Sequence, residues 1–150
     1  MNISAAVLSL VLTGCFGLVQ GASAKPSEKV PPCYGPKRWA TQVALDHMVD
    51  AGLIRDSASI YRGDTPYFLK TELLDSQKVG VFSGLEFPTS EVYRQIEKFT
   101  VKTKEGQSYE VLTVTEVSFV ECSMAHLATV LLAPEFRVLK TGTSILKEKK

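Results

Sequence analysis

The feature that most constrains the fold is a long stretch rich in β-branched residues between Val92 and Val120, interrupted once at residues 104–107. On both sides of the interruption, successive side chains are expected to point alternately to the two faces of a sheet, and the strong β-branched content is typical of strands. The interruption reads Lys-Glu-Gly-Gln, a sequence suited to a turn between antiparallel strands. The stretch therefore predicts a long β-hairpin, and the fold must contain an antiparallel sheet.

An amphipathic helix is predicted between Pro36 and Gly52. Asp46 and Asp50 fall on its polar side. Pro36 favours a break in the chain before the helix begins, and Gly52 favours its end. The residues that recur at three- and four-residue steps on the other side are Trp39, Ala40, Val43, Ala44, His47, Met48 and Ala51.

Further strands are predicted on either side of the hairpin. Residues 67–72 alternate as a strand does, residues 79–82 form a short apolar run, and residues 75–77 are expected to turn between them. Residues 127–133 supply one more strand before Pro134. The fold class is therefore α+β, with one N-terminal amphipathic helix covering a curved, mostly antiparallel sheet of four or five strands.

The order of these elements resembles that of cystatin-like and nuclear-transport-factor-like folds. The resemblance concerns architecture alone, because the hairpin lacks the Gln-x-Val-x-Gly inhibitor loop of the cystatins. It implies a helix held against a concave sheet and carries no function with it.

Residues 1–24 have the layout of a signal peptide. They contain no charged side chain, residues 5–19 are nearly all apolar, and Ala22-Ser23-Ala24 suits cleavage before Lys25. A lipobox-like sequence ending at Cys15 offers the alternative of a lipoprotein anchored through that residue. We expect a secreted or periplasmic protein with no stable membrane insertion after cleavage.

The mature chain is expected to form one domain. Residues 25–36 read as a proline-rich arm, residues 37–140 as a single globular domain and residues 141–150 as a charged tail. The formal net charge of +1 comes from scattered charges, which argues against nucleic-acid binding.

Two cysteines remain after cleavage, Cys33 and Cys122. In an oxidising compartment an even number of cysteines favours pairing, so we predict a disulfide between them. It would tie the arm to the sheet, with a stabilising effect of about 4 kcal/mol in the chain-entropy model. The alternative is a reactive thiol, in which a reduced Cys122 would pair with His126 as a catalytic dyad.

The sequence offers few groups for catalysis. His47, on or beside the apolar face of the helix, and His126 are the only histidines. Neither a metal site nor a cofactor is expected, because too few ligands converge and no phosphate-binding loop is present. Glu97 and Glu116 are expected on the solvated face of the hairpin, where a carboxylate-dependent hydrolase remains a weaker alternative.

A non-enzymatic function is therefore expected: a protein-binding module that inhibits or neutralises another protein. Apolar side chains on an exposed loop often contact partners, so Leu85 and Phe87 are candidate anchors, together with Lys104 and Glu105 at the hairpin turn.

The alternative to protein binding is a carrier of a small apolar ligand held between the helix and the sheet. Its pocket would be lined by Trp39, Val43, Phe99 and Val117.

Overall fold

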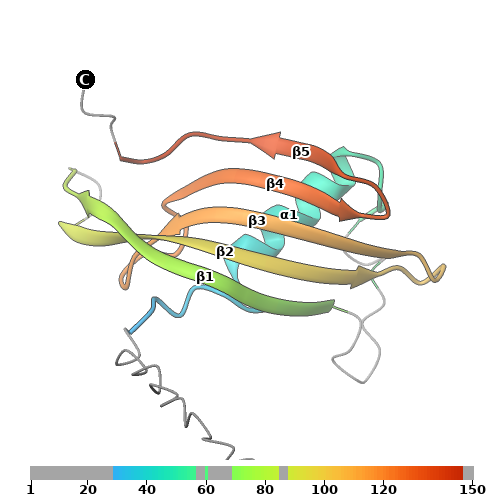
Figure 1. Ribbon diagram of the computed structural model, residues 1–150, viewed down its shortest axis with the longest axis horizontal. Helices are drawn as coiled ribbons and strands as arrows, with labels where there is room; N and C mark the ends of the chain where they lie inside the picture. The colour runs from blue at the N-terminus through green and yellow to red at the C-terminus, as the bar shows by residue number, and fades with distance from the viewer. Residues whose placement is uncertain (1–28, 57–59, 61–68, 85–87, 147–150) are drawn as a thin grey trace, which may run out of the picture.

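The computed structural model describes residues 29–56, 60, 69–84 and 88–146. One helix packs on one face of a five-stranded antiparallel sheet, which confirms the α+β class (Figure 1). The elements are α1 (Trp39–Asp50), β1 (Leu69–Phe82), β2 (Ser90–Lys102), β3 (Ser108–Val117), β4 (Ala125–Ala133) and β5 (Arg137–Thr141).

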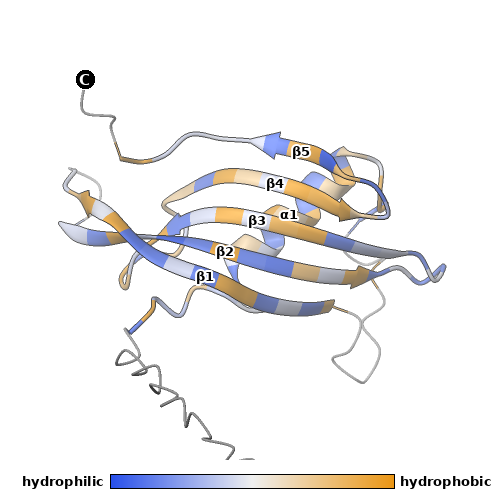
Figure 2. Ribbon diagram, in the orientation of Figure 1, coloured by the Kyte–Doolittle hydropathy of each residue, from blue (hydrophilic) through white to orange (hydrophobic). Residues whose placement is uncertain are grey.

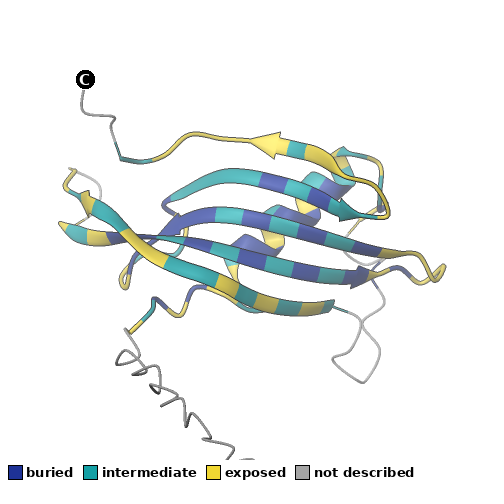
Figure 3. Cartoon of the chain, viewed as in Figure 1, coloured by how far each residue is buried: buried dark blue, intermediate teal, exposed yellow. Residues whose placement is uncertain are grey.

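The strands follow one another across the sheet in the order β1-β2-β3-β4-β5. The predicted hairpin is present as β2 and β3, with Gly106 at a positive φ of 86° in the turn, a conformation that glycine adopts without strain. Along both strands, side chains alternate between the helix side and the opposite side, and the helix-side positions are mostly buried (Figure 3).

The expectation of an N-terminal helix is wrong, because an irregular arm runs from Lys29 to Arg38 before it. Its small buried residues, Ala40 and Ala44, allow a close approach to the sheet. Gly52, at a φ of 69°, follows its C-terminus as predicted.

The expected turn at residues 75–77 is wrong, because β1 continues through it as one strand of 14 residues. Its pairing with β2 shifts register twice, between Leu73 and Asp75 and between Lys78 and Gly80. Each shift accommodates an extra residue on β1, so polar residues that favour turns are held in the ladder by the long neighbouring strand.

Two buried clusters fill the helix side of the sheet. The larger one joins α1 to the end of the sheet that carries Phe99, Val101 and Val111. The smaller one consists of Cys33, Tyr93 and Val117, with Cys122 packed against it. The main contacts of α1 are with β3, β4 and β5. The arm covers the end of β2 that carries Tyr93.

The disulfide predicted between Cys33 and Cys122 is present, with Cα atoms 5.2 Å apart. It joins the arm to the loop between β3 and β4 across a sequence separation of 89 residues. Closing so long a loop removes many conformations from the unfolded chain.

We predict that Cys33→Ser/Cys122→Ser lowers the free energy of unfolding by about 4 kcal/mol in the chain-entropy model. Denaturant unfolding of the oxidised wild type, the reduced wild type and the double variant measures this. The reduced wild type is the control and should match the variant. A double variant as stable as the oxidised protein would contradict the prediction.

Candidate functional site

A band of polar residues lies buried on the helix side of the sheet, between the two apolar clusters. It consists of Gln95 and Glu97 on β2, Thr113 and Thr115 on β3, and Thr129 on β4, each no more than 2 % exposed. Strand register places Thr113 directly opposite both Glu97 and Thr129. Polar groups in such a position need internal partners, so this polar band is the most unusual feature of the interior.

Glu97 is the titratable group of the polar band. Its Oε1 accepts a hydrogen bond of 2.7 Å from the backbone N–H of Gly35 in the arm. Burial raises the pKa of Glu97 to about 7, although the bond from Gly35 partly opposes that rise. The carboxyl group can therefore hold or release a proton near neutral pH, a property that functional carboxyl groups often show.

The arm also provides a hydrogen-bond partner for Gln95, the other polar-band residue on β2. Gln95 donates a hydrogen bond of 2.8 Å from Nε2 to the carbonyl of Pro31. The hydroxyl of Thr41 on α1 donates a bond of 2.7 Å to the carbonyl of Gly35, which fixes the arm against the helix. The arm is thus the hydrogen-bonding partner of two buried side chains of β2.

Thr113, at the centre of the band, has no hydrogen-bond partner for its buried Oγ1 among the described residues. Such a group costs about 1–3 kcal/mol relative to a satisfied one. This cost identifies Thr113 as the weakest point of the band.

The two histidines, which are distant in sequence, meet at the β4 end of the band. His47 Nδ1 and His126 Nε2 both lie 2.8 Å from Thr129 Oγ1, and the ring centroids are 4.6 Å apart. A hydroxyl group has one proton, so when both rings are neutral it donates to one imidazole and accepts from the other. The tautomers of the two rings are therefore coupled through Thr129.

The pKa values of both histidines are lowered. For His47 burial is the main cause, followed by the charge of Lys140, while Asp50 and Asp46 act in the opposite direction. For His126 burial again comes first and the charge of His47 second. The pair therefore favours neutral imidazoles at pH 7.

Glu97 and Glu116 do not form a carboxylate pair, because they lie on opposite faces of the sheet, opposite Thr113 and Arg94 respectively. Glu116 is fully buried, so the expectation of two solvated carboxylates is wrong. Arg94 Nη2 lies 2.8 Å from Glu116 Oε1, so the two form an ion pair.

The C-terminal segment also contacts the carboxylate of Glu116. Ser144 donates its hydroxyl to the carboxylate, and the N–H of Ile145 donates a bond of 2.9 Å. Residues 141–146 of the expected tail are thus in contact with the sheet: Thr141 ends β5, and Leu146 lies against Gly80 of β1.

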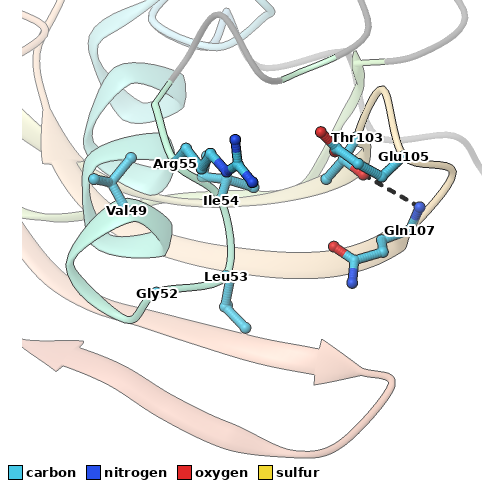
Figure 4. Close-up of a pocket in the computed structure, with 8 residues that line it drawn as sticks. All are labelled: Val49, Gly52, Leu53, Ile54, Arg55, Thr103, Glu105 and Gln107. Carbon is cyan, nitrogen blue, oxygen red and sulfur yellow. Dashed lines mark hydrogen bonds between the residues drawn. The ribbon is translucent and has the colours of Figure 1, made fainter.

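Of the candidate partner-binding residues, the structure describes Lys104 and Glu105. Leu85 and Phe87 lie outside the described residues. Lys104 and Glu105 are exposed at the turn between β2 and β3. Glu105 also lines a pocket of about 550 Å³ between this turn and the end of α1, where Figure 4 shows Ile54 and Arg55 between the helix and the turn.

The four residues expected to line a ligand pocket are not brought together. Phe99 belongs to the larger buried cluster and Val117 to the smaller one. Trp39 and Val43 line two different surface pockets.

The hydrogen-bond partners that form these sites were not predicted from the sequence. Thr129 and Gly35 each bond to a titratable side chain, and Ser144 bonds to Glu116. The available signal was the polar residues at the inward positions of the predicted strands, which alternation alone assigns to the core.

Within the described ranges, no helix is long and apolar enough to cross a membrane. The same residues hold no group of three or more His, Cys, Asp or Glu side chains that could ligate a metal ion. Comparison with protein-family models, with curated proteins and with solved structures finds no match for this chain.

Glu97→Gln should change how stability depends on pH. Because the folded pKa of Glu97, about 7, lies above its ordinary value of 4.5, the folded state keeps a proton that the unfolded state releases between these values. Wild-type stability from this group is therefore greatest below pH 4.5 and is lost as the pH rises to 7. Gln cannot ionise, so its free energy of unfolding does not fall in this way. As the pH rises from 4.5 to 7, the free energy of unfolding of the variant should therefore increase by about 3 kcal/mol relative to that of the wild type.

Urea unfolding at pH 4.5, 6 and 8 measures the difference. Glu72→Gln, at an exposed position of β1, is the matched control and should keep the wild-type pH slope. A difference between Glu97→Gln and the wild type that is the same at all three pH values would contradict the burial of an ionisable carboxyl group.

Proposed function

We propose that this protein is an exported, non-enzymatic binding module that recognises another protein through the face of its sheet opposite α1. We call this surface the open face. The observation that carries the proposal is an apolar patch at its centre. It consists of the outward residues Ile96, Leu112, Val114, Ala128, Val130 and Val138, which strand register places in two adjacent rows.

An antiparallel sheet with one solvated face normally carries polar residues there. Here β4 is hydrophobic along most of its length (Figure 2), and its outward residues Ala128 and Val130 are only partly buried. The patch reaches the edge of the sheet at Val138, which is 52 % exposed, and Phe136 just before β5 is 74 % exposed. Exposed apolar patches of this kind mark interaction sites.

The chemistry of the partner follows from the charges around the patch. Lys98 pairs with Glu110 at 2.9 Å on one side, and Arg94 pairs with Glu116 on the other. These charges are already compensated within the chain. The partner therefore offers an apolar protein surface, and burial of apolar area supplies the affinity.

The two edges of the sheet differ in how readily a partner can approach the open face across them. β1 is long, has two register shifts and carries charged residues, features that discourage pairing with another strand. β5 has only five residues, contains exposed Val138 and follows exposed Phe136. The β5 edge is thus the side from which the partner can approach.

Export is supported by the disulfide, which persists in oxidising compartments, and by the signal sequence predicted in residues 1–24. The proposal includes an effect on the partner: binding inhibits or neutralises it. The resemblance to cystatin-like folds adds nothing to it, because fold alone does not determine function.

The loop residues remain separate candidate contacts. Gly84 and Pro88, which flank Leu85 and Phe87, precede the start of β2, whereas Lys104 and Glu105 follow its end. A strand of 13 residues spans about 40 Å, so Pro88 and the Lys104–Glu105 turn lie at opposite ends of β2.

Capture of partners from the exported compartment, followed by measurement of their dissociation constants, tests the proposal. We expect Val130→Lys and Val138→Lys to weaken binding at least tenfold, because each places a charge in the apolar interface. Gln42→Lys adds the same charge on the exposed side of α1 and should bind as the wild type does. Leu85→Ala and Phe87→Ala test the loop anchors.

Two outcomes would contradict the proposal. The first is binding that persists in both open-face variants at unchanged melting temperature. The second is a wild-type dimer, seen by sedimentation, that Val130→Lys dissociates, because the open face would then bind a second copy of the chain.

A further inference from the structure

A surface pocket of about 560 Å³ lies where α1, β4, β5 and the C-terminal segment meet. His47 from α1 and His126 from β4 both line it, so the pair held by Thr129 is part of its wall. We call it the histidine pocket. It lies beyond the polar band and does not involve the apolar patch of the open face.

One wall of the histidine pocket is built for a negative charge. Lys140 of β5 lines it and forms no ion pair with the described residues. Thr141 and Thr143 add hydroxyl groups, whereas the hydroxyl of Ser144 is already donated to Glu116, and none of the lining residues is a carboxylate. An ammonium group, imidazole N–H donors and hydroxyl groups together are suited to binding an anionic group.

The other wall is apolar. Val43, Met124, Ala125 and Ile145 line it. A ligand that fills the pocket therefore carries a hydrocarbon part beside its charge.

The C-terminal segment is fitted closely to His126. A Cβ on Gly142 would lie 2.0 Å from the carbonyl oxygen of His126, and the Gly142 N–H donates a bond of 2.8 Å to the carbonyl of Leu127. Only glycine allows this approach, so the hydroxyl-bearing residues that follow are held at the mouth of the pocket.

We propose that the histidine pocket binds a small organic carboxylate, with its charged group at Lys140 and the two imidazoles and its hydrocarbon part against Val43 and Met124. A metal ion fits the same place less well. The two imidazoles are only two ligands, and the charge of Lys140, which acts on both rings, repels a cation.

Binding should strengthen as the pH falls. Protonation of either imidazole adds a positive charge beside Lys140, and a bound carboxylate stabilises that charge. Two further charged groups, Asp46 and Asp50 of α1, raise the pKa of His47. The bound anion therefore raises the pKa values of both histidines toward or above their ordinary value.

The test is an NMR titration of the histidine Cε1–H signals of the intact protein with hexanoate, acetate, hexanol and inorganic phosphate, at pH 6 and 8 and at matched ionic strength. We expect saturable shifts with hexanoate, binding at least tenfold tighter than acetate and at least threefold tighter at pH 6 than at pH 8. Hexanol should give no saturable shift.

Lys140→Gln should weaken hexanoate binding about tenfold, because it removes the fixed charge of the site. Lys102→Gln, at an exposed position at the end of β2, is the control and should leave binding unchanged. His126→Gln should reduce the difference between pH 6 and pH 8.

Four results would overturn the proposal: no saturation with hexanoate, equal binding of hexanol, saturation with phosphate alone, or wild-type affinity in Lys140→Gln. None of them bears on the open face, so this inference and the proposed function fail separately.

Discussion

The attachment of the arm to β2 is the interaction on which the rest of the structure depends. Glu97 and Gln95 face the interior where apolar side chains are normal, and the arm supplies partners through Gly35 and Pro31. The disulfide from Cys33 holds the arm in place. Without these contacts the buried Glu97 carboxyl group would lose its bond from Gly35, and the Gln95 amide would keep a longer bond of 3.4 Å to Ser76 Oγ. A buried polar group that loses its partner costs about 1–3 kcal/mol.

This arrangement assigns different tasks to the two faces of the sheet. On the helix side, burial shifts the pKa values of Glu97, which bonds to the arm, and of the two histidines at the β4 end. The open face is apolar at its centre, and its central charges are paired. Proton-dependent behaviour is therefore expected on one side of the molecule and protein recognition on the other.

The sequence was sufficient for the helix, the hairpin and the disulfide. Each rests on a local pattern or, for Cys33 and Cys122, on the number of cysteines left after the predicted cleavage. The continuity of β1 was not predictable in this way, because residues 75–77 favour a turn locally and are held straight only by pairing with β2. Local propensity gives way to tertiary pairing in such segments.

The candidate sites were harder to predict for a related reason. His47 and His126 were recognised singly, but their meeting at Thr129 depends on how α1 crosses β4. Likewise, Glu116 is buried by Ser144 and Ile145, which belong to a segment that reads as a tail. Contacts between elements distant in sequence leave no periodic signal in one chain.

The most direct test of this account is hydrogen exchange at the Gly35 amide, measured by NMR before and after reduction of the disulfide. Its N–H donates to Glu97, so slow exchange is expected in the oxidised protein. After reduction the arm should separate from β2, and exchange at Gly35 should become fast while amides in the centre of β3 stay protected. Fast exchange in the oxidised protein, or equal protection in both states, would contradict the claim that the tethered arm satisfies the buried side chains.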